Sequence, residues 1–226
     1  MKAKTNPTIK AHLIRGVLLL IAVCAVPFAL AQFPQVILYD QYDPPGNASI
    51  SSENRPDMPE WSDEAADNFV IPATQIWQIT EVDIHGSGFF NTPSSFDVHF
   101  YTDAEGLPGT EVYVATGLAF VVNLGNYIIT VTSPAILSEG TYWVSVVGNI
   151  TDFAFFWDGR NTTNNGFATA YRNPLDGLGT CCTDWARAQD CLGVPYYDQR
   201  FRLVGNIVSV RPAPTARPRP TPRPRP

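Results

Sequence analysis

The amino-acid sequence predicts an all-β protein, an antiparallel β-sandwich of jelly-roll type. Between residues 36 and 210, short segments of alternating apolar and polar residues recur about every 10 residues, separated by clusters of turn-forming residues. The composition points the same way, because only 16% of the residues are charged and the chain contains 16 Gly and 20 Pro. Both observations disfavour a helical bundle, and we expect very little helix.

The first 31 residues have the pattern of a secretory signal peptide. A basic stretch (residues 2–15) precedes an apolar run (residues 16–30), which ends in the small-residue site Ala29-Leu30-Ala31. We expect cleavage before Gln32, so that the mature domain comprises residues 32–210. A retained membrane span is the less favoured alternative, because the run is short and Pro27 interrupts it.

The strand signals follow in order along this domain. The clearest lies at residues 95–101, where Phe96, Val98 and Phe100 share one face while Asp97 and His99 share the other. The same alternation predicts strands at residues 127–131, 142–146, 153–157 and 200–203.

Three local features complete the expected fold. The apolar phase changes after Ile79 and resumes at Val82, which predicts a β-bulge between them. Residues 63–67 are expected to form one helical turn, and Leu107-Pro108-Gly109 a type II turn that closes a hairpin. Residues 158–198, rich in Asn, Gly and Asp, are expected to be mostly a long loop.

A series of motifs carries a family resemblance. They are DEAADNFVIP (63–72), WQI (77–79), FYTD and GLPG (100–103 and 106–109), GTYWVSV (140–146), FW (156–157), Cys182 to Trp185, and FRL (201–203). Together they resemble a β-sandwich module of secreted bacterial proteins, over nearly all of residues 36–205. The resemblance implies the fold and the compartment, but no settled activity and no catalytic residue. Cys181 departs from it, since the family pattern would place Gly there.

Charge divides the chain sharply. All 21 acidic residues lie in residues 32–210, together with only six of the 15 basic ones, so we expect no nucleic-acid partner. Residues 211–226 carry five Arg and seven Pro without an acid, which predicts a disordered or extended tail. We expect this tail to dock on an anionic envelope polymer; the alternatives are a weak contact with the acidic domain and a plain spacer.

Three cysteines remain after signal cleavage. We expect a disulfide between Cys182 and Cys191, because a bridge between the adjacent Cys181 and Cys182 would be strained. Cys181 is then left unpaired. A zinc site made by the three thiols is the alternative, but no histidine lies near them in the sequence to complete it.

Catalysis and calcium binding are the other functions considered from the sequence. His85 and His99 lie outside any nucleophile motif, so we expect no enzyme; a hydrolase would require a cleft with two close, desolvated acids. No cofactor is expected, although Ca²⁺ is open to consideration because several carboxylates fall at strand ends or in turns. These are Asp40, Asp43, Asp103, Glu105, Asp152 and Asp158. The alternative is that they cap local backbone N–H groups.

Aromatic side chains gather in or beside the long loop, where they suggest a stacking platform for a sugar. The platform residues are Trp157, Tyr171, Trp185, Tyr196 and Tyr197, with Asp158, Arg160, Asn161 and Asn164 as polar neighbours. The opposing interpretation is that Trp157 belongs to the core and that Trp185 packs over the disulfide.

These observations predict a secreted, non-enzymatic module that binds a ligand outside the cell or at the cell surface, without a membrane span after signal cleavage. The alternatives are a carbohydrate-binding module, with a polysaccharide as partner, and a structural protein of the envelope or matrix.

Overall fold

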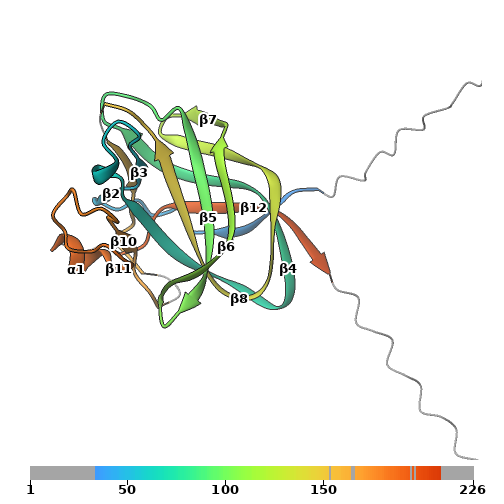
Figure 1. The fold of residues 1–226 in the computed structure, drawn as a ribbon. Coiled ribbons are helices and arrows are strands. Elements are labelled where there is room, and N and C mark those ends of the chain that lie inside the picture. The colour runs from blue at the N-terminus through green and yellow to red at the C-terminus, as the bar shows by residue number, and fades with distance from the viewer. Residues whose placement is uncertain (1–33, 153, 164–165, 194, 196, 210–226) are drawn as a thin grey trace, which may run out of the picture. The chain divides into compact units, whose positions relative to one another are not determined.

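The computed structural model describes residues 34–152, 154–163, 166–193, 195 and 197–209, and these residues form an antiparallel all-β fold, as predicted (Figure 1). The predicted signal peptide and tail lie outside the described residues. The strands are β1 (Val36–Asp40), β2 (Ser49–Ser51), β3 (Glu53–Asn54), β4 (Glu64–Gly88), β5 (Ser95–Ala104), β6 (Leu107–Leu118), β7 (Phe120–Asn123), β8 (Asn126–Asn149), β9 (Phe155–Asp158), β10 (Ala170–Arg172), β11 (Ala186–Arg187) and β12 (Phe201–Ser209). The helices are the 3₁₀ turn η1 (Pro59–Trp61) and α1 (Ala188–Leu192).

Two long strands, β4 and β8, form the frame of the fold. They pair antiparallel over three stretches: residues 66–71 with 140–145, 76–79 with 135–138, and 81–85 with 126–130. The main sheet runs in the order β1-β12-β4-β8-β5-β6, and Figure 1 shows β4 and β8 as long, curved strands. Strands β7 and β3 also join β8, whereas β9 and β10 join β4.

Interruptions in this pairing let the two strands bend. The register shifts between Ile79 and Glu81, which confirms the predicted β-bulge. A second shift lies between Ile71 and Ile76, where Thr74 has a positive φ of 69° and donates its backbone N–H to the Glu139 carboxylate at 2.5 Å. Because it bends, each long strand can pair with different neighbouring strands along its length.

Two local predictions were wrong. Residues 64–67 belong to β4 rather than to a helical turn, because their backbone pairs with β10 and β8 and Ala65 and Ala66 are fully buried. The hairpin between β5 and β6 does form, but its turn is Glu105-Gly106, whose φ angles are 55° and 86°. Pro108 lies inside β6, at the edge of the main sheet, where proline is tolerated.

The alternating side chains supply one large core and one smaller cluster. Phe69 is fully buried in the large core and packs against the rings of Trp77, Phe100 and Phe201, which come from three strands. The opposite face of the sheet carries a cluster of Ala66, Tyr101, Trp143 and Ala170, covered by Phe167 and Trp185 from the loop region. This two-sided packing is compatible with a sandwich, and the jelly-roll connectivity stays a prediction.

Replacing Phe69 by alanine should therefore destabilise the whole domain. We expect Phe69→Ala to lower the free energy of unfolding by about 3–5 kcal/mol, because it leaves a cavity between strands. Phe90→Ala is the matched control, since 76% of the Phe90 side chain is already exposed. Denaturant titration of both variants measures the difference, and equal losses would contradict the central position assigned to Phe69.

Candidate functional site

A pocket of about 440 Å³ opens beside β2, β3 and β9, at the end where β4 finishes. Its walls are largely apolar and its floor carries charged and hydroxyl groups. The lining residues are Ser51, Glu53, Arg55, Trp61, Asp63, Phe89, Ala154, Phe156 and Leu178. They come from segments that are far apart in the sequence, so the pocket exists only in the folded chain.

Two exposed aromatic side chains stand at the wall of this pocket. Trp61 is 42% exposed and ends η1, the short turn that begins at Pro59 and is closed by the bond from the Trp61 N–H to the Met58 carbonyl. Phe89 is 56% exposed and follows β4, where its N–H donates to the Ala154 carbonyl at 2.8 Å. Large rings left exposed beside a pocket are typical of ligand contacts.

The floor of the pocket is built around Asp63. Its carboxylate accepts hydrogen bonds from the Ser51 hydroxyl, from the Tyr171 hydroxyl at 2.9 Å and from the Glu53 N–H at 3.1 Å. Burial raises the pKa of Asp63 to about 7, because desolvation outweighs these bonds. Asp63 thus connects β2, β3 and β10 through its carboxylate.

Glu53 is the second buried acid in the floor. Its carboxylate accepts the Phe155 N–H at 2.6 Å and lies 3.6 Å from the Arg55 guanidinium, which also pairs with Asp57 at 3.2 Å. Burial raises the pKa of Glu53, while the Phe155 N–H and the Arg55 guanidinium oppose the shift. The floor therefore offers two desolvated acids and one arginine already engaged by carboxylates.

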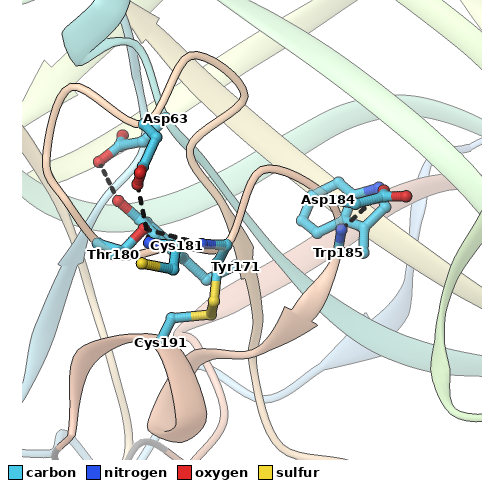
Figure 2. The surroundings of a disulfide bond; sticks show 9 residues. Asp63, Tyr171, Thr180, Cys181, Asp184, Trp185 and Cys191 are labelled. Carbon is cyan, nitrogen blue, oxygen red and sulfur yellow. Dashed lines mark hydrogen bonds between the residues drawn. A yellow bond between two sulfur atoms is a disulfide. The ribbon is translucent and has the colours of Figure 1, made fainter.

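Leu178, another wall residue, is held by hydrogen bonds around Asn173, next to a disulfide. The buried Asn173 side chain donates to the Glu60 and Ser62 carbonyls and accepts the Leu178 N–H at 3.0 Å. The Asn173 N–H in turn donates to the carbonyl of Cys182. Cys182 is bonded to Cys191, which confirms the predicted disulfide; Figure 2 shows this bridge with Asp63 and Tyr171 around it.

The structure buries two aromatic residues of the predicted platform. Trp157 and Tyr171 are fully buried, and Trp157 donates its indole N–H to the Arg200 carbonyl. Neither ring can stack on a sugar, so including them was wrong; the alternating phase of β9 points Trp157 inward. Arg160 is buried too, and it donates to the Asp43 carbonyl.

Trp185 and Asp158, two other predicted platform residues, are engaged by different neighbours. Trp185 packs edge-on against Tyr101 and beneath the Arg172 guanidinium, whose carbon lies 4.4 Å from the ring centroid. The Asp158 carboxylate lies 2.7 Å from Nδ1 of the His85 ring. Tyr197 is 43% exposed. Tyr196 and Asn164 lie outside the described residues. Cys181, as expected, is free, and it is exposed.

The turn carboxylates considered for calcium are mostly engaged by neighbouring groups. Asp40 pairs with Arg202 at 3.0 Å, and Asp103 accepts the Trp143 indole N–H at 2.9 Å. His99, like His85, contacts a carboxylate, that of Glu111 at 2.8 Å. Within the described part of the chain, no group of three His, Cys, Asp or Glu residues could hold a metal ion.

Comparisons with known proteins leave the resemblance seen in the sequence as a prediction. No family model matches the chain, and no curated protein matches it. Among the described residues, no helix is both long and apolar enough to cross a membrane.

The buried acids predict a stability that falls as pH rises. In the folded state the pKa of Asp63 is about 7, and that of Asp83 is about 6, through burial and the nearby Glu81. Between pH 4 and pH 7 the folded chain therefore retains protons that the unfolded chain has lost, and the free energy of unfolding decreases through this window. Asp63 alone accounts for at most about 4 kcal/mol.

Calorimetry at pH 5 and pH 8 measures this effect. We expect a lower Tm at pH 8, and a smaller difference between the two pH values in Asp63→Asn. Glu105→Gln, which changes an exposed turn carboxyl, should keep the difference of the unmodified protein. A Tm that is higher at pH 8 would show that desolvation of these acids does not control the profile.

Removing the disulfide should loosen the wall of the pocket. The bridge closes a loop with a sequence separation of 9, so the double variant Cys182→Ser/Cys191→Ser should lose roughly 2–3 kcal/mol of stability on the chain-entropy model. Amide exchange should rise most in residues 173–182. Cys181→Ser is the control and should change neither quantity; unchanged exchange in the double variant would contradict the proposed support of Leu178.

Proposed function

We propose that this chain is a secreted, non-enzymatic binding module whose ligand is a carbohydrate held in the pocket beside Trp61. One observation carries the proposal: two exposed rings, Trp61 and Phe89, stand over a floor of carboxylates, a hydroxyl and a guanidinium. Sugars suit such a site, because their ring faces are apolar while their hydroxyl groups require hydrogen-bond partners.

The pocket also favours a second candidate, a glycoside hydrolase, because it contains two desolvated acids, Glu53 and Asp63. We favour binding because both carboxylates already accept bonds that hold the fold. Asp63 connects β2, β3 and β10, and Glu53 fixes the start of β9 through Phe155. A general acid or nucleophile must instead be directed at the scissile bond.

Export and cell-surface attachment belong to the same proposal. They rest on the signal-peptide pattern of residues 1–31 and on the Arg/Pro-rich segment 211–226. A disulfide supports an oxidising compartment, since such bridges persist mainly in secreted proteins. The tail would add an electrostatic contact with an anionic envelope polymer, separate from the pocket.

Replacing Trp61 should weaken glycan binding. We expect Trp61→Ala to bind at least about tenfold more weakly, because a lost stacking surface is worth about 1.5–3 kcal/mol. The matched control is Tyr197→Ala, since Tyr197 is 43% exposed, Trp61 is 42% exposed, and Tyr197 does not line the pocket.

The measurement is a pull-down of the exported protein on neutral and charged polysaccharides, with and without calcium, followed by titration calorimetry. Equal losses of glycan affinity in both variants would show that the glycan does not bind in the pocket. If the protein releases reducing ends from a bound polysaccharide and Asp63→Asn abolishes this release, the chain is a hydrolase and not a binding module.

A further inference from the structure

We name the pocket and two depressions linked to it by shared lining residues the groove. A second depression of about 490 Å³ shares Arg55 and Trp61 with the pocket, and adds Met58, Asn91 and Asp152. A third depression of about 320 Å³ shares Asn91 with the second. Its other lining residues are Pro56, Thr92, Ser94, Asn149, Ile150 and Thr151. Each depression therefore has at least one lining residue in common with the next.

The chemistry of the lining changes along this groove. The first depression has the exposed rings of Trp61 and Phe89, whereas the third is lined largely by amide and hydroxyl side chains. In the third, the Asn149 side chain is fixed by bonds to Asn54, Ser95 and Asp97. Its orientation is therefore set before any ligand arrives, which lowers the entropic cost of binding.

A tight turn connects the apolar end to the polar end. An added Cβ at Gly88 would lie 1.6 Å from the Asn91 carbonyl oxygen, so only glycine permits this close approach. The turn places Phe89 in the first depression and Asn91 at the junction of the second and third. The turn thus fixes the position of the Phe89 ring, which could stack on a sugar, relative to the Asn91 side chain, which could form hydrogen bonds.

The charge of the groove restricts its occupant. The lining of the three depressions contains one basic residue, Arg55, against Glu53, Asp63 and Asp152. Arg55 is already paired with Glu53 and Asp57. A polyanion would meet like charge in the first two depressions, which costs binding energy, whereas an uncharged chain would not.

We propose that the groove holds an uncharged, linear glycan, one stretch of which occupies all three depressions, with a sugar ring stacked on Trp61 and later units hydrogen-bonded near Asn91 and Asn149. This inference rests on the proposed carbohydrate function and adds to it the charge and length of the ligand. It assigns the anionic polymer, if one is bound, to the tail and not to the groove.

The test measures affinity against chain length. Fragments of two, four and six units of cellulose, xylan, mannan and chitin are titrated into the exported protein, with polygalacturonate and heparin fragments as polyanions. We expect at least one neutral series to bind, with the six-unit fragment about tenfold or more tighter than the two-unit fragment. The polyanions should bind more weakly than that series to a chain that ends at Val210, because this chain lacks the basic tail.

Two variants locate the subsites. Asn91→Ala should weaken the six-unit fragment and leave the two-unit fragment unchanged, whereas Trp61→Ala should weaken both. Asn123→Ala, in an exposed residue outside the three depressions, is the control. Affinity that does not depend on length, or tighter binding of polyanions to the shortened chain, would overturn the inference and leave the carbohydrate function standing. Failure of every glycan to bind would reject both.

Discussion

Strands β4 and β8 pair antiparallel along most of their length, and each of the other described strands joins them directly or through one neighbour. Their hydrogen bonds therefore set the position of nearly everything else. This β4–β8 ribbon bends and stays paired, because register shifts near Thr74 and Thr80 accommodate the change of direction. Phe69 then faces Trp77 from the same strand across the core, at a centroid distance of 6.1 Å. A ribbon that stayed straight could not bury both rings against each other.

The candidate site depends on the ribbon but is not made by it. Asp63, one residue before β4, connects β2, β3 and β10 through its carboxylate, and it lies in the floor of the pocket. The rings that stand at the wall come from η1 and from the turn after β4. A buried acid thus lies at the base of the candidate site, while short connecting segments carry its exposed rings.

The sequence predicted the features that depend on local pattern. Period-two alternation gave the strand at residues 95–101 and the bulge at Thr80, and loop closure gave the bridge between Cys182 and Cys191. Residues 63–67 were misassigned because pairing with β8 and β10 overrides the local helical preference. The pocket was missed because its residues lie up to 127 positions apart, between Ser51 and Leu178, and no local signal joins them. Trp61, the last residue of η1, did carry one hint, because it fits no alternating strand.

The turn that carries Phe89 and Asn91 also bears on how such a protein can change over generations. The hydrogen bonds between β4 and β8 involve neither the residues of this turn, Phe89 and Asn91, nor Leu178 in its loop. Substitutions at these tips can alter what the groove accepts without disturbing the pairing of β4 with β8. Gly88 is the exception, because its backbone touches that of Asn91. Variation among descendants should spare this glycine while the side chains on either side of it diverge.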